Sequence, residues 1–429
     1  MPTSLRGIAN RARRDSGAKF RDLYGLLNEA NLRWCFKQLR RSAAPGIDGV
    51  TFEDYERDLD ENLRQLVGRL KQKKYKAKLV RRKYIPKGKG KRRPLGIPAL
   101  EDKLLQMAAA KILTAIYEQD FLDCSWGYRP GRGARQASQI LSDRLIKRKH
   151  NWVVEADIKG FYDNISHHWM ERMLEERIED RAFIRLVQKW LRAGILEEDA
   201  KVIHPATGTP QGGIVSPVLA NIYLHYVLDL WFERIVKKAC RGDASLMRYA
   251  DDFVGAFQYE DDASRFEREL KGRLGKFELE VAPEKTRKVR FSRFEMAKNG
   301  NFEFLGFAFW WELSRKGKPL VRRRTSPKKL YASVQALGEW IRENRHRRTN
   351  RVMNMLRKKL QGYWNYYGVI GNLRSLEKVY WQCRRLLFKW LNRRSQKRSL
   401  NWESLERLLV RYRIHAPRII ERPLQPVLV

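Results

Sequence analysis

Alternating apolar and polar positions predict a hairpin over 246–257. Two short apolar runs flank the adjacent carboxylates Asp251 and Asp252, so we expect two strands, each with one buried face, joined by a charged turn. Two neighbouring acids in a folded site repel one another unless a cation or hydrogen bonds compensate. A solvated turn is the ordinary explanation of such a pair, so its functional weight depends on what the rest of the chain places beside it.

Apolar residues at helical spacing predict helices along much of the chain. The predicted helical stretches cover two faces within 19–72, then 102–117, a helix that follows Arg135 and runs through Ile146, then 218–232, 261–277, and roughly 328–345, 350–367 and 372–391. The last three follow a polar, basic linker predicted over Ser314–Lys329 and are expected to form a separate small domain. No apolar run approaches the roughly 18 residues of a membrane span, so none is predicted.

Strands are predicted at three further places. Val80–Pro98 has the pattern of two strands joined by a basic glycine turn, Trp152–Ile158 that of a buried strand carrying Asp157 at its end, and Phe302–Phe309 that of one strand. The basic hairpin can close over triphosphates, although a surface hairpin that contacts only a nucleic-acid backbone fits the same charges. Strands mixed with helices predict an α+β fold, and 429 residues predict two or three domains.

Charge narrows the class of partner. The chain carries 89 Lys and Arg against 49 Asp and Glu, a net charge of +40, which predicts a polyanionic partner. Between Arg315 and Arg422, 30 cationic residues outnumber 6 acidic ones and alternate with tryptophans and tyrosines. Such surfaces stack on bases and neutralise phosphates, although about half or more of these aromatics should pack inside the helical domain. Binding should weaken steeply with salt.

The cysteines and the N-terminus indicate the compartment. The four cysteines, Cys35, Cys124, Cys240 and Cys383, are too scattered for a zinc site or a disulfide scaffold, which favours a reducing compartment. The Arg-rich stretch 1–20 is expected to be a basic arm that touches nucleic acid. An organellar transit peptide is the alternative.

Two glycine-containing loops can approach a ligand. Ser125–Arg135 suits a phosphate backbone but lacks the spacing of a P-loop. Gly208–Gly213 is a tight turn before Ser216-Pro217, which favours a helix start there.

Two acids at strand ends, Asp157 and Asp251, suggest one chemical solution. Synthesis of a phosphodiester uses two divalent ions, one activating a 3′-hydroxyl and one stabilising the leaving pyrophosphate. Carboxylate oxygens are the ligands that magnesium takes.

With these motifs the chain resembles the reverse transcriptases encoded by group II introns, also called intron maturases. The match runs from about Ala44 to Arg422, and its motifs, weak singly and specific together, are Arg93–Pro98, Gly127–Arg132, Asp157–Asn164, Thr209–Gly213 with Ser216-Pro217 and Leu219–Asn221, Tyr249–Asp252, Lys285-Thr286 and Phe304–Phe307. The resemblance implies a right-hand polymerase: a basic helical extension over 1–72, fingers and a palm with an antiparallel sheet over 73–313, and an all-α thumb or maturase domain over 314–429.

The resemblance also implies the metal site and the acid. Asp157 and Asp251 would bind two Mg²⁺ ions, or Mn²⁺ in their place, and the Ile158 carbonyl and Asp252 would complete the set. Asp251 would be the indispensable shared ligand, and Asp252 a supporting carboxylate. Lys285 would protonate the departing pyrophosphate.

Contacts to the nucleotide and to RNA are implied in the same way. Lys87 and Arg93 would hold the triphosphate, Gln211 would lie along the nucleotide, and Tyr162, or else Phe161, would lie beneath the sugar and exclude a 2′-hydroxyl. The expected contacts to nucleic acid are Arg129, Arg132, Arg393, Arg394 and Lys397. The segment 361–367, Gln-Gly-Tyr-Trp-Asn-Tyr-Tyr, and the segment 389–397 resemble the region that grips intron RNA.

We therefore expect an RNA-directed DNA polymerase that uses deoxynucleoside triphosphates, an RNA template with a DNA primer, and intron RNA whose splicing it assists. It is expected in the cytoplasm of a bacterium, or else in an organelle. A Cys/His endonuclease segment does not follow before Val429, so cleavage of a second strand by this polypeptide is not expected. Two alternatives stay open: an RNA-binding splicing cofactor with an idle polymerase site, and a domesticated reverse transcriptase in repair or phage defence.

Overall fold

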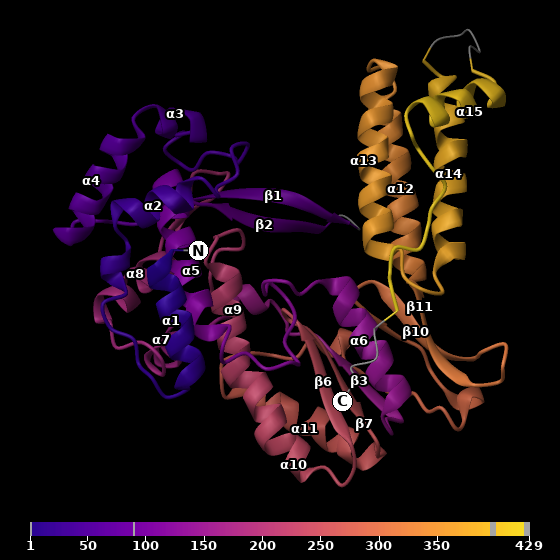
Figure 1. The fold of residues 1–429 in the computed structure, drawn as a ribbon, viewed down its shortest axis with the longest axis horizontal. Coiled ribbons are helices and arrows are strands. Elements are labelled where there is room, and N and C mark those ends of the chain that lie inside the picture. Colours follow the sequence, from indigo (N-terminus) through magenta and orange to yellow (C-terminus); the bar gives the residue numbers. More distant parts are fainter. Residues whose placement is uncertain (1, 89–90, 395–399, 424–429) are drawn as a thin grey trace.

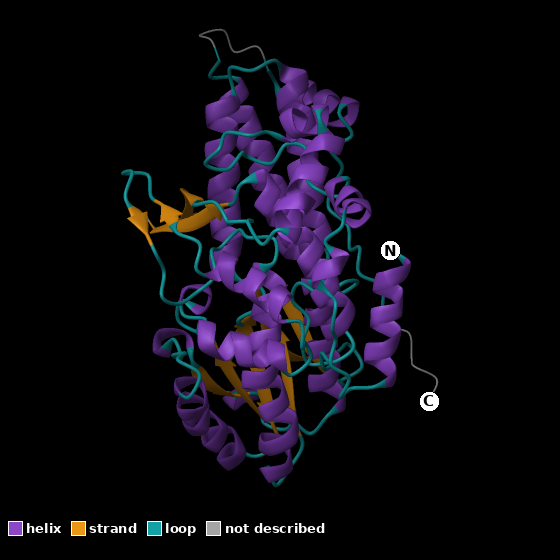
Figure 2. Cartoon of the chain, turned by 90° about the vertical axis from the view of Figure 1, so that its left-hand side faces the viewer, coloured by secondary structure: helices purple, strands orange, loops and turns teal. Residues whose placement is uncertain are grey.

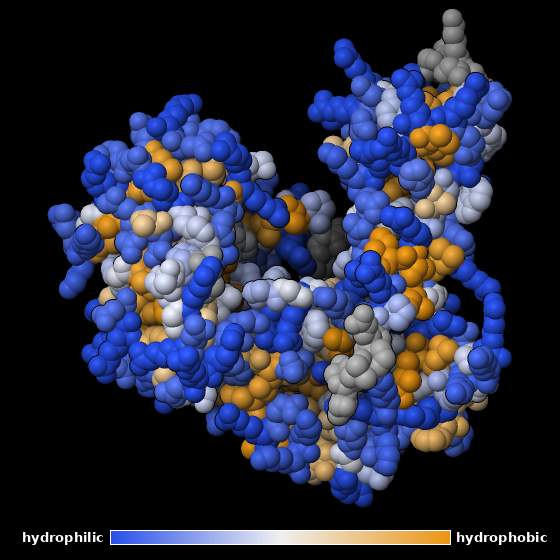
Figure 3. All heavy atoms as spheres, in the orientation of Figure 1, coloured by the Kyte–Doolittle hydropathy of each residue, from blue (hydrophilic) through white to orange (hydrophobic). Residues whose placement is uncertain are grey.

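The chain forms three lobes (Figure 1), and the space-filling view shows a hollow between the left-hand and right-hand lobes (Figure 3). The computed structural model describes residues 2–88, 91–394 and 400–423. In Figure 1 the N-terminal helices and the β1–β2 hairpin form the left lobe, an antiparallel sheet with its helices forms the base, and a helical bundle rises on the right. The predicted α+β fold class, with fingers, palm and thumb, is confirmed. None of the described helices combines the length and apolar character needed to cross a membrane.

The fingers combine amphipathic helices with a small sheet. Their helices are α1 (Thr3–Arg14), α2 (Glu29–Phe36), α3 (Phe52–Arg57), α4 (Leu59–Lys71) and α5 (Leu100–Tyr117), and their sheet has the order β2-β1-β4-β5, with β1 (Val80–Gly88), β2 (Lys91–Ile97), β4 (Ile195–Leu196) and β5 (Val202–Ile203). The basic hairpin β1–β2 was predicted, and it extends towards the thumb (Figure 1). The expected N-terminal arm is the helix α1, which packs on α5 through Leu5 and Ala12.

The palm is built on a four-stranded antiparallel sheet. Its order is β6-β7-β3-β8, with β3 (Trp152–Ala156), β6 (Ala244–Tyr249), β7 (Asp252–Phe257) and β8 (Arg287–Arg290). The helices beside it and beneath the fingers are α6 (Ala134–Lys147), α7 (His167–Glu175), α8 (Arg181–Leu191), α9 (Ser216–Leu224), continued through π-helical turns to α10 (Lys237–Ala239), and α11 (Glu260–Gly275).

Both faces of this sheet are covered, as Figure 2 shows for strands packed between helices. Leu246 and Phe253 pack in a core shared with α9, α11 and the finger helices, whereas Met247 and Val254 pack with α6 and the next sheet. The expectation that each hairpin strand has a single buried face was therefore wrong. A strand covered on both sides is apolar at nearly every position, which is why the runs beside Asp251 are continuous.

The predicted linker over Ser314–Lys329 was wrong, because most of it is regular structure. A third sheet, β11-β10-β9, comprises β9 (Phe302–Phe304), β10 (Phe307–Leu313) and β11 (Pro319–Thr325), and α12 starts at Pro327. The strand β11 escaped prediction because one of its inward positions is Arg323, whose charge pairs with buried Glu421. The single strand expected over Phe302–Phe309 is two strands, because the backbone reverses at Leu305-Gly306 with φ of 53° and 77°.

The thumb has its own apolar core. It consists of α12 (Pro327–Asn344), α13 (Thr349–Tyr367), α14 (Leu373–Leu391) and α15 (Trp402–Arg411), the first three close to the predicted bounds. The finger helices, in contrast, share one core with the palm, so the predicted extension over 1–72 is not packed as a separate unit. On this packing we propose a boundary between palm and thumb near Ser326 in place of 313/314.

Candidate active site

The adjacent acids lie in a tight turn at one end of the palm sheet. Tyr249 pairs with Asp252, which leaves Ala250 and Asp251 as the two turn residues, and Ala250 has a φ of 58°. On the neighbouring strand Ala156 pairs with Phe253, so the register continues with Asp157 beside Asp252. The sheet thus brings together two acids that lie 94 positions apart in the sequence.

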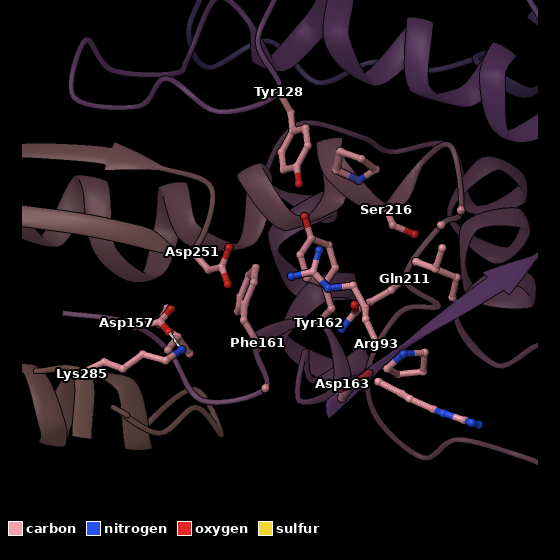
Figure 4. Close-up of a pocket in the computed structure, with 18 residues that line it drawn as sticks. Arg93, Tyr128, Asp157, Phe161, Tyr162, Asp163, Gln211, Ser216, Asp251 and Lys285 are labelled. Atoms are coloured by element: carbon pink, nitrogen blue, oxygen red, sulfur yellow. Dashed lines mark hydrogen bonds and ion pairs between the residues drawn. The ribbon is translucent and has the colours of Figure 1, made fainter. Parts of the chain in front are cut away.

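Asp157 and Asp251 line one cavity of about 580 Å³ at the base of the cleft (Figure 4). The cavity also collects most of the predicted nucleotide contacts, together with residues that were not singled out. The predicted residues in its wall are Arg93, Asp157, Ile158, Phe161, Tyr162, Gln211, Asp251 and Lys285, and the additional ones include Arg92, Tyr128, Asp163 and Ser216. The Lys87 side chain lies outside the described part of the chain.

Asp252 lies on the other side of Asp157. It lines a neighbouring cavity of about 400 Å³ that Asp157, Glu155 and Lys285 share, together with the turn at Leu305-Gly306 and two lysines at the start of α12. The two adjacent acids therefore face different spaces. This division supports the prediction that Asp251 has the central role and Asp252 a supporting one.

The electrostatics of the acids favour a bound cation. The Lys285 ammonium donates a hydrogen bond to Asp157 Oδ2 and forms an ion pair with it. Desolvation and the charges of Asp157 and Asp251 raise the pKa of Asp252 to about 6, and desolvation together with Asp157 raises the pKa of Asp251. Both raised pKa values reflect carboxylates that are buried close to one another. A bound divalent ion would offset the repulsion between them.

The oxygen donors fit a hard divalent ion. The backbone beside Ile158 is paired through Asp157 O and Lys159 N, so the Ile158 carbonyl has no backbone partner among the described residues. Within the same described residues, no three His, Cys, Asp or Glu side chains already form a closed metal cage. Lys285 is the cation beside Asp157, and the carboxylates with the Ile158 carbonyl supply the oxygen donors that a magnesium ion takes.

Backbone contacts join the segments around Gly96, Tyr162 and Gln211 beside this cavity. Gly96 N donates to Gln211 O at 2.6 Å, and a Cβ on Gly212, whose φ is 117°, would lie 2.5 Å from Gly96 O. Thr209 N donates to Tyr162 O at 2.8 Å. Hence three motifs that together span more than a hundred residues of sequence meet through their main chains, and glycine is required because a side chain would separate them.

The structure distinguishes Tyr162 from Phe161. Phe161 is 2% exposed and packs on Tyr223 in the shared core, whereas Tyr162 is only partly buried and projects towards the cavity (Figure 4). Burial raises the pKa of Tyr162, so its phenol stays protonated. The Tyr162 hydroxyl has no hydrogen-bond partner of good geometry among the described residues, although Tyr128 points towards it from above. Tyr162 is therefore the better candidate for the sugar contact.

Arg248 is a functional residue that the sequence reasoning missed. It is completely buried, and its five N–H donors bond to both carboxylate oxygens of Asp229, to Asn221 Oδ1, to Ser125 Oγ and to the carbonyl of Ala250. Burial lowers the pKa of Arg248, but the charge of Asp229, its hydrogen bonds and the smaller effects of Cys124 and Asp251 together raise that pKa. An arginine inside an apolar strand is the signal that could have revealed this anchor of the catalytic turn.

The loop 125–128 supports the turn from above. Trp126 N bonds to Arg248 O, Asn221 Nδ2 donates to Gly127 O at 2.6 Å, and the backbone of Gly127 lies against Ala250. Tyr128 follows in a left-handed conformation, with φ of 58° and 56% of its surface exposed above the cavity. Such strain in a bulky residue is retained where the surrounding structure fixes it, typically at functional sites.

Replacing Gly127 by Ala is expected to disturb the site directly. A Cβ there would lie 2.4 Å from Ala250 N, so the catalytic turn would have to move. A shift of this kind should lower the rate of primer extension on the order of 100-fold. Primer-extension assays quenched at a series of times would measure the rate. Gly133→Ala is the matched control, because among the described residues its Cβ would meet only Gln136 Oε1, at 3.5 Å. Equal rates for the two variants would contradict the packing argument.

The predicted RNA contacts differ in accessibility. Arg129 is 6% exposed, and its guanidinium is occupied by Glu118 and by the carbonyls of Leu122 and Ser125, so it stabilises its loop and the prediction that it contacts RNA was wrong. Arg132 pairs with exposed Asp123 and stays a prediction. In the thumb, Arg393 is exposed beside Trp390 and Arg394 bonds to Thr349. Lys397 lies outside the described residues.

The aromatic segment 361–367 connects thumb and palm. Tyr366 donates to Leu305 O and stacks on Phe307, and its pKa is raised to about 12 by burial and by Tyr249 and Asp252. Trp364 belongs to the thumb core, whereas Trp381 and Trp402 are about half exposed. The expectation of aromatics divided between core and surface is confirmed, and this segment holds the thumb close to the acids.

A palm sheet that presents carboxylates to a cleft beneath a basic hairpin defines a right-hand nucleic-acid polymerase. Within this class, the family model described as reverse transcriptase (RNA-dependent DNA polymerase) matches residues 85–309. This match covers more than half of the chain, so the chain belongs to that family. The resemblance to group II intron-encoded reverse transcriptases is confirmed by the relatives.

The relatives include proteins of bacteria and organelles. The group II intron-encoded protein LtrA of Lactococcus lactis subsp. cremoris is 36% identical over 235 residues, 53% of this chain and 38% of LtrA. Protein YkfC of Escherichia coli (strain K12) is 30% identical over 308 residues, 65% of this chain and 78% of YkfC. Nuclear intron maturase 4, mitochondrial, of Arabidopsis thaliana is 25% identical over 130 residues, 30% of this chain and 16% of that protein. The chain thus matches less than half of LtrA.

Proposed function

We propose that this protein is an RNA-directed DNA polymerase that extends a DNA primer on an RNA template. The observation that carries the proposal is the shared cavity in which Asp157 and Asp251 face Arg93, Tyr162 and Gln211. Acids and cations around one cavity suit the triphosphate of a nucleotide, whose reacting phosphate is held through metal ions and whose remaining charges need cationic partners. Family membership supports the choice of reaction.

The donor set supports binding of two Mg²⁺ ions, or Mn²⁺, by Asp157, Asp251 and the Ile158 carbonyl, with Asp252 in support. When bound, these ions would activate the primer 3′-hydroxyl and stabilise charge on the pyrophosphate. Arg93 would neutralise the triphosphate from β2, and Gln211 would support the nucleotide from a loop fixed by Gly96. Lys285 already holds a proton beside Asp157 and would donate it to the leaving pyrophosphate.

The direct test is extension of a labelled DNA primer on an RNA template by the purified chain with the four deoxynucleoside triphosphates and Mg²⁺. Extension to the template end, dependent on the divalent ion, is the expected result. A chain that binds the primer–template but never extends it would instead favour the splicing cofactor. The carboxylates argue against that rival, because RNA binding does not require them.

Replacing Tyr162 by Ala is expected to relax sugar selection. The ring projects into the cavity where the sugar would lie, and its loss would leave room for a 2′-hydroxyl. The ratio of kcat/KM for deoxyribonucleotides over ribonucleotides should fall on the order of 100-fold, the discrimination that a packed site achieves against an added hydroxyl. Tyr162→Phe keeps the ring and should keep the ratio. If Tyr162→Ala retained the selectivity of the unchanged protein, the sugar contact would have to be reassigned.

We also propose that the chain assists the folding and splicing of an intron RNA. The basic thumb supports this role, and LtrA is by name encoded in a group II intron. The bacterial relatives support a cytoplasmic location. A splicing assay with the intron that surrounds the coding region would test the role separately from polymerisation.

A further inference from the structure

The segment after α15 is fixed at both of its ends. At its start Ile414 N bonds to Leu409 O, and the Ile414 side chain is buried in the thumb core. At its end Ile420 N and Glu421 N both bond to Gly368 O, and Glu421 accepts hydrogen bonds from Arg323 and from Ile370 N. The backbone in Figure 1 runs along the bundle between these anchors, from α15 towards the palm. Its geometry is therefore set by the fold.

Between the anchors this segment and α13 enclose a cavity of about 310 Å³. The cavity has an apolar floor of Leu360, Trp364 and Ile414, each at most 5% exposed. Its basic side chains are Arg357 from α13 and Arg413, His415 and Arg418 from the segment, and none of the described residues that line it is an acid. The backbone N–H groups of the lining residues 415, 416 and 418 donate no backbone hydrogen bond within the described chain. The cavity thus combines guanidinium groups with unused N–H donors.

The arginines lack counter-ions. No described carboxylate forms an ion pair with Arg357, Arg413 or Arg418, whereas the nearby acids Glu421 and Glu406 are paired with Arg323 and Arg384. The residues outside the described chain contain no Asp or Glu, so none of their side chains supplies a carboxylate. Cations gathered around one cavity repel each other, and a bound anion would offset that repulsion.

Arg413 is placed against its local preference. Arg413 N bonds to Val410 O and Ile414 N to Leu409 O, which is the Schellman arrangement that ends a helix with one left-handed residue. That residue is usually glycine, but here it is Arg413 with a φ of 53°, at a backbone cost of about 1 kcal/mol. Glycine would satisfy the helix end without this cost, so the helix end alone does not explain why an arginine is there. A cavity whose ligand requires a guanidinium group does explain it.

We propose that this cavity binds a backbone phosphate of RNA, with the attached sugar against the floor of Leu360 and Trp364. Guanidinium groups and unused backbone N–H groups are the donors that phosphate oxygens take, and arginine forms paired hydrogen bonds to them. The site lies in the thumb, apart from the acids of the polymerase cavity. The proposal rests on the nucleic-acid function proposed above and adds a specific contact to it.

The test uses Arg413→Gly and Arg418→Ala in the full chain. Arg413→Gly removes a guanidinium but supplies the residue that the helix end prefers, so its thermal unfolding midpoint should equal or exceed that of the unchanged protein. Its Kd for single-stranded RNA, measured by fluorescence anisotropy, should rise about 10-fold at moderate salt. The slope of log K against log salt should become shallower by about 0.7, the value for one phosphate of a single strand.

Arg407→Ala is the matched control, because it removes one exposed cation from α15 outside the cavity. An RNA–DNA duplex and a deoxynucleoside triphosphate serve as comparison probes. Weaker binding of RNA by both cavity variants, with nucleotide binding intact, supports the proposal. Affinity and salt slope equal to those of Arg407→Ala, or a loss confined to the triphosphate, would overturn it. Failure of the unchanged protein to extend a primer would count against the polymerase function alone, since RNA binding is measured separately.

Discussion

Replacing Asp251 by Ala is expected to lower the rate of primer extension by about 10³-fold or more while RNA affinity stays within a factor of about two. Asp251 faces the cavity that Asp157, Arg93 and Tyr162 line, whereas the basic surfaces expected to bind RNA lie elsewhere. Loss of a metal-binding carboxylate removes several kcal/mol of charge stabilisation from the transition state, and each 1.36 kcal/mol is a factor of ten in rate. Single-turnover extension and anisotropy would measure the two quantities.

The control for charge is Asp261→Ala, which removes an acid that is 81% exposed at the start of α11 and whose one ion pair among the described residues is with Arg241. This control should extend primers at the unchanged rate. Asp252→Ala should fall between the two, because Asp252 lies beside Asp157 but faces the neighbouring cavity. Normal extension by Asp251→Ala would refute the site assignment. Retained splicing by an inactive Asp251→Ala would show that the two proposed roles are separable.

The parts of the fold that depend on periodicity were predictable from sequence. The hairpin at Asp251, the strand before Asp157 and the long thumb helices follow from spacing of apolar residues, and the structure places them within a few residues of the predicted bounds. The proximity of Asp157 and Asp251 could be anticipated, because Asp157 follows one predicted strand and Asp251 lies between two others. The spacing of apolar residues within each element was sufficient to predict it, because those residues are the ones that the element buries.

The charged residues inside the molecule were not predictable in this way. Arg129, Arg248 and Arg323 are all nearly or fully buried, and each depends on one carboxylate from another element of the fold: Glu118, Asp229 or Glu421. Sequence alone suggests that an arginine is exposed, because an unpaired buried charge is costly. Only the folded chain shows the partner, which is why Arg129 was assigned to RNA and Arg248 to no role. The strand β11 was not predicted for the same reason, because the sequence suggests that its Arg323 is exposed.

Breaking the buried pair of Arg248 and Asp229 is expected to have the largest effect on stability. Both side chains are fully buried and joined by two hydrogen bonds of 2.6 Å. Removing one partner by Asp229→Ala leaves an uncompensated guanidinium and should lower the free energy of unfolding by about 3–5 kcal/mol. Chemical denaturation of the full chain would measure this loss, with Asp261→Ala again as the control.

The double variant Arg248→Met, Asp229→Leu separates stability from positioning. Replacing both charges by apolar side chains removes the desolvation cost, so the double variant should be more stable than Asp229→Ala, and the double-mutant cycle should give a coupling of more than about 1 kcal/mol. Extension should nevertheless stay at least about 10-fold slow, because the Ala250 carbonyl and Asn221 lose the donor that orients the turn. Full activity in a stable double variant would show that Arg248 only fills space, whereas a stable but slow enzyme would establish it as the residue that positions Asp251.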